Sequence, residues 1–376
     1  MRKMAFIILI ALLGIDYGAD TYAAPPIRPG DEIFISRRHK GDVPIGDVFS
    51  EWRYIPLEKT DKSVVMDASR TKRVLTSKEG LIYILDKDKV MRFRSDGLLD
   101  HVYDKETVSE PFQYLSNFAL WDNGDMTLLD VGSRSLLSYT EAGRFISRVS
   151  FPDWNARCVI ALDDSLMLLN ITNEKIGQYT YHIFNKYTGK EVKAFGQVQR
   201  VNQMSFWLKE FLYRYDGKIL WHGFQTMNIY EVKRDTAVVR YTINVDNRTP
   251  PKDFWWKADG KDGFQLTIDY MDKNYIGHIP FYVESDESIL LYFDGGKDKN
   301  KDYAFIDKVT RETKVIERFV FDDGLAYDPE VLYSIADGWC AILIYPEHMR
   351  RNAAFMKRFP GLGKESNPVL FLGRIK

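Results

Sequence analysis

Apolar runs separated by tight polar turns recur along the whole chain. Residues 79–97 (EGLIYILDKDKVMRFRSDG) have the pattern turn, strand, turn, strand, turn. Asp-Gly or Asn-Gly between strand-like runs is a strong hairpin signal, because such turns need positive φ. The pattern therefore predicts six copies of one hairpin. The second positions of their turns are Gly80, Gly124, Asp164, Gly217, Glu287 and Gly338.

A second hairpin follows each of the first five copies, as in LLSYTEAGRFISRVSF (136–151). Each unit therefore has four antiparallel strands. Successive turns are separated by 44, 40, 53, 70 and 51 residues. Six such units predict an all-β fold, a six-bladed β-propeller. A β-sandwich or two smaller β domains are the alternative.

The sixth unit is one strand short. It has PEVLYSIAD, WCAILIYP and NPVLFLGRIK, with no fourth strand after them. We expect FSEWRYIPLE (49–58) to supply this strand, because a ring closed by the N-terminal strand has no open sheet edge.

The first 23 residues have the pattern of a secretory signal. Arg2 and Lys3 precede the apolar run MAFIILIALLGI (4–15), and small residues lead up to Ala23. The run is too short for a comfortable membrane span. We therefore predict a signal peptide over residues 1–23; an uncleaved N-terminal anchor is the alternative.

The predicted signal sets the remaining boundaries and the expected location. Residues 24–48 are a lead-in, and residues 49–376 form the propeller. No cysteine lies near the cleavage point, so a lipoprotein anchor would have no attachment point. We expect an exported protein of the periplasm or cell envelope, not a lipoprotein, with no transmembrane span after cleavage.

The charge of the chain gives no support for nucleic-acid or membrane binding. Lys+Arg total 52 and Asp+Glu total 53, so no large field of one sign favours nucleic acid or an anionic membrane.

Cys158 and Cys340 fall in blades 3 and 6, on opposite sides of the predicted ring. A disulfide needs Cα atoms within about 7 Å. We therefore predict two free, buried thiols.

The inner strands are expected to place polar residues at a similar level along the central channel. Those in blades 1–4 could bind a carboxylate, a phosphate or sugar hydroxyls near the entrance of the central channel. The alternative is that they hydrogen-bond between blades. The residues six positions before the first residue of each turn are Arg73, Asn117, Arg157, Glu210, Pro280 and Val331.

Two insertions depart from the repeat, at about 246–278 and 346–366. Both insertions fall in loops on one face of the propeller, called the top. This face carries the loops that join one blade to the next and the loops that join the second strand of a blade to its third. Long insertions are often functional, and a packing lid is the alternative. The second insertion predicts one helix with Met349 and Met356 on one face, ending at Pro360, and the two insertions could touch.

The first insertion holds further candidate site residues. Trp255 and Trp256 could form an aromatic platform for a sugar, or belong to the core. His278 could act as a base or ligand. The six histidines show no metal-ligand spacing, and the sequence has no HExxH, CxxC or Gly-rich phosphate loop. We expect no metal and no cofactor.

Three segments carry a resemblance to a known family. VPIGDVFSEWRYIPLEKTDKSVV (43–65), IYILDKDKVMRFRSDG (82–97) and NPVLFLGRIK (367–376) resemble six-bladed β-propeller proteins exported by Bacteroidetes, a family similar to NHL-repeat and TolB-like propellers. The resemblance spans about residues 43–376 and implies a cell-envelope location. It implies little about activity, because a propeller is a scaffold for unrelated functions.

Two functions stay open. The first is a monomeric binding or scaffold protein that holds a glycan, a peptide or an envelope partner protein through its top face. The second is a propeller enzyme, such as a polysaccharide lyase or glycoside hydrolase. A glycosidase needs two carboxylates at a defined separation, and Glu210 and Glu284 are candidates.

Overall fold

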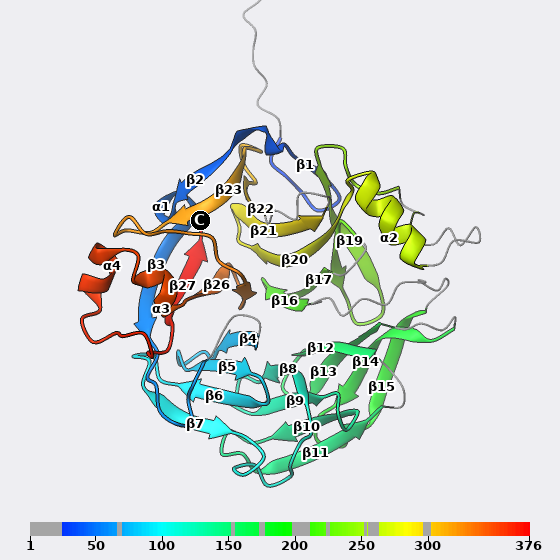
Figure 1. Ribbon diagram of the computed structural model, residues 1–376. Helices are drawn as coiled ribbons and strands as arrows, with labels where there is room; N and C mark the ends of the chain where they lie inside the picture. Colours follow the sequence, from blue (N-terminus) through cyan, green and yellow to red (C-terminus); the bar gives the residue numbers. More distant parts are fainter. Residues whose placement is uncertain are drawn as a thin grey trace, which may run out of the picture.

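The computed structural model shows six antiparallel sheets arranged in a ring (Figure 1). This is the predicted six-bladed β-propeller. The residues described are 25–65, 70–151, 155–172, 177–197, 211–222, 226–251, 254, 263–295 and 302–376. The predicted signal peptide lies outside them.

Blades 1–3 are built from four consecutive strands each. Blade 1 has β4 (Thr71–Thr76), β5 (Ile82–Asp86), β6 (Lys89–Phe93) and β7 (Leu99–Tyr103). Blade 2 has β8 (Leu115–Leu120), β9 (Met126–Asp130), β10 (Ser135–Tyr139) and β11 (Phe145–Ser150). Blade 3 has β12 (Asn155–Ala161), β13 (Leu166–Thr172), β14 (Tyr179–Asn185) and β15 (Glu191–Gln197).

Blades 4–6 follow the same order and carry additions. Blade 4 has β16 (Phe211–Tyr215), β17 (Lys218–His222), β18 (Asn228–Val232) and β19 (Ala237–Val245). Blade 5 has β20 (Ile276–Glu284), β21 (Ser288–Gly295), β22 (Asp302–Asp307) and β23 (Thr313–Val320), with the short β24 (Ala326–Tyr327) paired to β23. Blade 6 has β25 (Leu332–Ser334), β26 (Trp339–Ile344), β27 (Val369–Ile375) and β3 (Phe49–Pro56).

The turns have the backbone geometry that the sequence signal requires. Asp216 and Gly217 take φ of 49° and 68°, and Asp337 and Gly338 take 46° and 82°. Two successive residues at positive φ make the tight hairpin turn that suits twisted strands. Behind the turns, strands such as β5 and β9 are buried along their whole length. They lie between neighbouring blades, which explains why they read as continuous apolar runs.

The ring closes as expected. Strand β3 pairs with β27 from Val369↔Pro56 to Ile375↔Phe49. The inner strands β4, β8, β12, β16, β20 and β25 pack side by side, and β25 returns to β4. The N-terminal strand therefore completes blade 6.

Residues 27–48 form an N-terminal strap that the sequence did not reveal. Its strands β1 (Glu32–Ile35) and β2 (Lys40–Pro44) add in parallel to β19 and β23, the outer strands of blades 4 and 5. Between them lies η1 (Arg37–His39), and α1 (Ile45–Val48) leads into β3. The buried Asp302 of blade 5 forms ion pairs of 2.6 Å with Arg37 and 2.7 Å with Lys40. The strap thus covers the outer edges of blades 4 and 5 before the chain enters β3 and completes blade 6.

Both cysteines are free and buried, as predicted. Cys158 lies in β12 of blade 3 and Cys340 in β26 of blade 6. Burial raises the pKa of the Cys340 thiol well above its usual value. Both thiols therefore behave as small core residues.

The insertions differ from the expected single helix. The second forms two short helices, α3 (Pro346–Met349) and α4 (Ala353–Arg358). Asn352 interrupts them because its side chain accepts a hydrogen bond of 2.9 Å from the backbone of Phe355 and caps α4. Phe355, rather than Met356, is the fully buried residue of α4.

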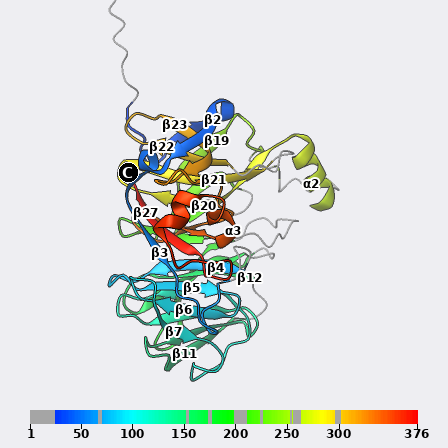
Figure 2. The ribbon, with the colours of Figure 1, turned by 60° about the vertical axis from the view of Figure 1, so that its left-hand side comes forward.

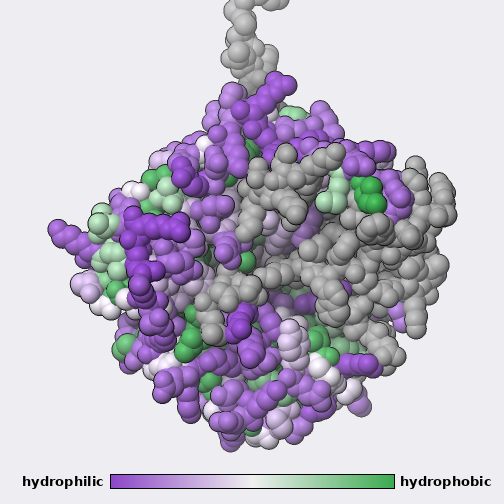
Figure 3. Space-filling model, in the orientation of Figure 1, coloured by the Kyte–Doolittle hydropathy of each residue, from purple (hydrophilic) through white to green (hydrophobic). Residues whose placement is uncertain are grey.

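The described part of the first insertion contains α2 (Gly263–Asp272). Helices α2 and α3 lie on the same side of the ring (Figure 2), whereas α2 and α4 stand at opposite edges of it (Figure 1). These two helices therefore do not touch. Hydrophilic residues predominate over the described part of this face (Figure 3). Among the described residues, no helix is both long and apolar enough to cross a membrane.

Candidate functional site

The polar residues of the inner strands make contacts between blades. Arg73 and Asn117 are buried, with 5% and 3% of their surface exposed, and Arg157 is half-buried. The Asn117 amide donates to the backbone oxygen of Arg157 at 3.4 Å. For Asn117, this geometry favours a hydrogen bond between blades over a role in ligand binding.

Arg73 reaches across the channel. It belongs to blade 1, yet its guanidinium donates to the backbone oxygen of Leu212 in blade 4 at 3.3 Å. Burial lowers the pKa of Arg73 to about 10. The group still carries a positive charge at neutral pH, and its side chain spans the channel at this height.

Of the other predicted site residues, only His278 lies among those that the structure describes. His278 is buried in β20, at a register position opposite Asp294. Glu210, Trp255 and Trp256 lie outside the described residues. Their proposed roles stay predictions.

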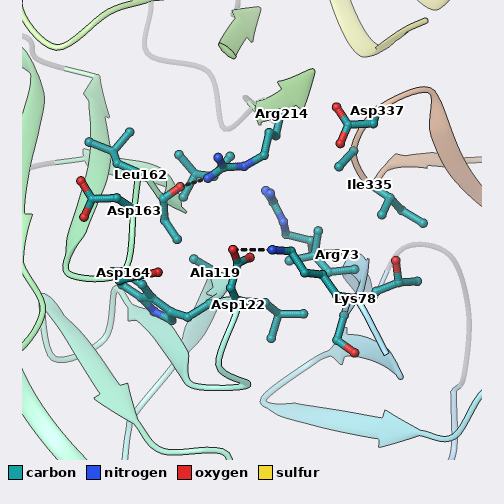
Figure 4. Close-up of a pocket in the computed structure, with 18 residues that line it drawn as sticks. Arg73, Lys78, Ala119, Asp122, Leu162, Asp163, Asp164, Arg214, Ile335 and Asp337 are labelled. Carbon is teal, nitrogen blue, oxygen red and sulfur yellow. Dashed lines mark hydrogen bonds and ion pairs between the residues drawn. The ribbon is translucent and has the colours of Figure 1, made fainter. Parts of the chain in front are cut away.

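A cavity of about 320 Å³ occupies one end of the channel. Its walls are the ends of inner strands from blades 1, 2, 3, 4 and 6 and the turns that follow them (Figure 4). The lining residues are Arg73, Leu75–Lys78, Ala119–Asp122, Ile160–Asp164, Arg214 and Ile335–Asp337. These turns join the first and second strands of each blade. The cavity therefore lies at the opposite end of the channel from α2 and α3, where we expected the site.

Three cationic side chains converge in this cavity. Arg73 points to its centre, with Arg214 and Lys78 on either side (Figure 4). Arg214 donates a hydrogen bond to the backbone oxygen of Ala161. Lys78 forms an ion pair with Asp122 at 2.6 Å. Arg73 and Arg214 thus each donate to an uncharged carbonyl oxygen, and such a hydrogen bond satisfies a donor without cancelling its charge.

The acidic residues of the cavity lie at its rim. Asp122, Asp163, Asp164 and Asp337 are all exposed. Asp163 pairs with Arg234 at 3.2 Å, and Asp337 accepts a 2.8 Å hydrogen bond from a backbone N–H of the neighbouring turn. Water and salt screen exposed charges more than buried ones. The field inside the cavity is therefore set mainly by the buried and half-buried arginines.

Among the described residues, none of blade 5 lines this cavity. A parallel bridge joins Arg214 of blade 4 to Ala336 of blade 6, and the backbone of Asp337 donates to the oxygen of Arg214 at 3.0 Å. These contacts close the wall in front of the end of β20. The asymmetry of the cavity follows from this bridge.

Glu284, a candidate for a catalytic carboxylate, lies in a separate buried cluster between blades 4 and 5. It is 0% exposed. Its carboxylate accepts hydrogen bonds from Arg240 at 2.9 and 3.0 Å, from Tyr241 at 3.0 Å, from Tyr282 at 2.7 Å and from Lys308 at 3.0 Å. Burial alone raises the pKa of Glu284, but the hydrogen bond from Arg240 and the charge of Lys308 outweigh it and hold the pKa below its ordinary value. This carboxylate therefore has a structural role, and it is not among the residues that line the channel cavity.

The structure adds residues that sequence analysis missed. Lys78, Arg214 and Asp337 line the cavity, yet none stands six positions before a turn. Arg214 stands two positions before the Asp-Gly turn of blade 4, where blades 1, 2, 3 and 6 have Ser, Trp, Ala and Ile. Blade 5 also has a charged residue there, Glu284, so blades 4 and 5 depart from the four other blades. This departure was the signal that could have found Arg214. Within the described residues, no group of His, Cys, Asp and Glu is arranged to hold a metal ion.

Comparison with known proteins places the chain in a family. A family model described as a domain of unknown function, DUF4934, matches residues 35–374. The chain belongs to this family. Comparison with curated proteins gives no match. The match covers the same part of the chain as the resemblance noted in the sequence, while the likeness to NHL-repeat and TolB-like propellers stays a prediction.

Solved structures confirm the architecture. The chain is similar to a Bacteroides fragilis protein named as a candidate exported protein, with 15% identity, 91% of this chain and 99% of that chain covered, and a TM-score of 0.72. It is also similar to a DUF4221 family member from Bacteroides vulgatus, with 11% identity, coverage of 88% and 97%, and a TM-score of 0.49. Virginiamycin B lyase from Staphylococcus aureus follows, with 9% identity, coverage of 78% and 82%, and a TM-score of 0.45. The first likeness shows the fold, and the other two are too distant to add to it.

Proposed function

We propose that this protein is an exported binding protein whose channel cavity holds an anionic group. The observation that carries the proposal is the convergence of Arg73, Lys78 and Arg214 on one cavity of about 320 Å³. This volume is in the range of small-ligand sites. Guanidinium groups suit carboxylate and phosphate because they offer several N–H donors in a fixed plane.

The proposed location follows from other features. The N-terminal pattern of a signal peptide supports export, and so does the name of the similar Bacteroides fragilis protein. We place the protein in the periplasm or cell envelope, without a lipid anchor and acting as a monomer. Its ligand is presented by a glycan, a peptide or a partner protein, and it enters from the face of the Asp-Gly turns.

Calorimetric titration tests this function. Phosphate, succinate, glucuronate and acidic peptides are titrated into the full-length protein and into the Arg214→Met variant. Losing a hydrogen bond to a charged group costs about 1.5–3 kcal/mol, so binding should weaken by about tenfold or more. Arg148→Met is the matched control, since Arg148 pairs with Glu110 on the outer strand of blade 2.

Two results would contradict the proposal. One is that no anion of the panel binds the parent protein. The other is that Arg214→Met and Arg148→Met bind equally well while both remain folded. Partial recovery of binding in Arg214→Lys would show that the charge at this position matters.

A further inference from the structure

A second cavity lies beside the channel, where blades 3 and 4 pack together. It measures about 290 Å³, and we refer to it as the blade 3–4 groove. Its apolar lining consists of Leu162, Leu168, Ile219 and Val232. Its charged lining consists of Lys218, Glu231, Lys233 and Arg234. The groove thus combines an apolar floor with an excess of basic side chains.

The groove and the channel cavity adjoin each other. Leu162 lines both of them. Asp163 belongs to the channel cavity and Arg234 to the groove, and their side chains form the 3.2 Å ion pair between the two. Both partners are exposed, and exposed ion pairs contribute little energy and rearrange easily. A ligand larger than the channel cavity can therefore extend into the groove.

The channel cavity suits the end of a chain better than its middle. The Arg73 side chain spans the channel from blade 1 to blade 4 at the inner end of the cavity. A chain that enters from the rim therefore meets the cationic groups and goes no further. A terminal carboxylate places its charge at such an end, and paired N–H donors of arginine fit it well.

We propose that the ligand is the C-terminal end of an acidic peptide. Its terminal carboxylate lies among Arg73, Lys78 and Arg214, and its preceding residues lie in the blade 3–4 groove. There, Lys233 and Arg234 favour acidic side chains, and the aliphatic floor takes an apolar one. This inference rests on the proposed function of the channel cavity.

The lining of the groove favours a peptide over an acidic glycan. Its described floor is aliphatic, whereas a sugar ring is commonly held against an aromatic face. The one Trp in the channel wall, Trp121, is 4% exposed. Its ring is covered by the Lys186 ammonium, 4.0 Å from the ring centre. An aromatic platform is thus absent from the linings of these two cavities as far as the structure describes them.

Fluorescence anisotropy with labelled hexapeptides tests the inference on the full-length protein. Pools built from Glu, Leu, Ser and Gly are compared as free acids and as C-terminal amides, with oligogalacturonate as the acidic-glycan probe. We expect the free acids to bind at least about tenfold more tightly than the amides. Equal binding of the amides would overturn the inference, and so would tighter binding of oligogalacturonate; either outcome leaves the proposed anion site intact. If none of the probes and no small anion binds, both proposals fall.

Paired charge reversals test the groove itself. Lys218→Glu combined with Lys233→Glu should weaken acidic peptides by about tenfold and leave succinate binding unchanged, because both residues line the groove and neither lines the channel cavity. The control combines Lys190→Glu with Lys193→Glu, two exposed residues at the outer edge of blade 3. Equal losses in the two double variants would reveal a general charge effect and overturn the groove assignment. Unfolding midpoints confirm that each variant is folded.

Discussion

Arg214 and Glu284 occupy the same position in neighbouring blades, yet they have different roles. Each stands at the end of an inner strand, where Arg214 pairs with Ile219 and Glu284 with Ile289. Each also reaches the preceding blade, Arg214 through Ala161 and Glu284 through Arg240. Glu284 meets two cations and is completely buried, whereas Arg214 meets a carbonyl oxygen and stays half-buried beside a cavity.

This comparison shows how a charged residue in a repeat becomes structural or becomes available to a ligand. A buried carboxylate is tolerated only with opposite charges and hydrogen bonds around it. Arg240 and Lys308 provide them within the protein. Arg214 keeps its charge facing a cavity, where a ligand can supply the opposite charge.

Glu284→Gln should cause the largest loss of stability. The substitution keeps the size of the side chain but leaves the buried Lys308 without a carboxylate partner and Arg240 with only that of Glu231, 3.1 Å away. Breaking a buried ion pair in this way costs about 3–5 kcal/mol in the free energy of unfolding. Urea unfolding of both proteins measures it, with the exposed Glu51→Gln as the matched control. A loss equal to that of the control would refute the structural role of the cluster.

The free energy of unfolding at acid pH should depend on the same cluster around Glu284. The pKa of Glu284 is lower in the folded protein than its ordinary value of 4.5. Its stabilising effect is therefore fully present above the unfolded value and is lost as the pH falls through the lowered folded value. The stability gap between parent and Glu284→Gln should narrow between about pH 6 and about pH 3. A gap that stays constant over this interval in urea titrations would contradict the shift.

Arg214→Met should separate stability from binding. The variant loses the hydrogen bond to Ala161, and a typical hydrogen bond contributes about 1 kcal/mol to stability. The aliphatic side chain still fills much of the same volume. We expect a loss of about 1 kcal/mol in urea unfolding, together with the loss of anion binding described above. A loss as large as that of Glu284→Gln would place Arg214 with the structural cluster instead.

Lys78→Ala should have the smallest effect. Lys78 and Asp122 are 70% and 68% exposed at the rim, and exposed ion pairs are screened by water and salt. The unfolding midpoint should not change measurably, and anion affinity should fall by only about two- to fivefold. A complete loss of binding would show that the rim, rather than the arginines within, holds the ligand.

Local patterns were enough to predict the blades. Turns such as Asp216–Gly217 need positive φ at adjacent positions, and the residues that accept it are recognisable in the sequence. The missing strand of blade 6 could be counted, so the pairing of FSEWRYIPLE with the last strand was also predictable. The strap was not, because β1 and β2 have only four and five residues and pair with strands more than 200 positions away.

The candidate site was only partly predictable. Arg73 was correctly brought to the channel by its position in the repeat, because inner strands line the axis of any propeller. Whether it faces a ligand or another blade depends on the length of its side chain and on Leu212, which lies 139 positions away. The wall of the cavity likewise depends on tertiary contacts, because the bridge between Arg214 and Ala336 joins blades 4 and 6.

The repeat and the number of blades could be predicted from the sequence alone, because both depend on turns and apolar runs that lie close together in the chain. The closure of the ring could be predicted by counting strands, although it pairs residues 49–56 with residues 369–375. Which charges are neutralised could be learned only from the folded protein. Arg214 and Glu284 are equivalent in the repeat, and their surroundings are supplied by other blades. The physical reason is that the energy of a buried charge depends on all the groups that surround it, and folding brings those groups together from distant parts of the chain.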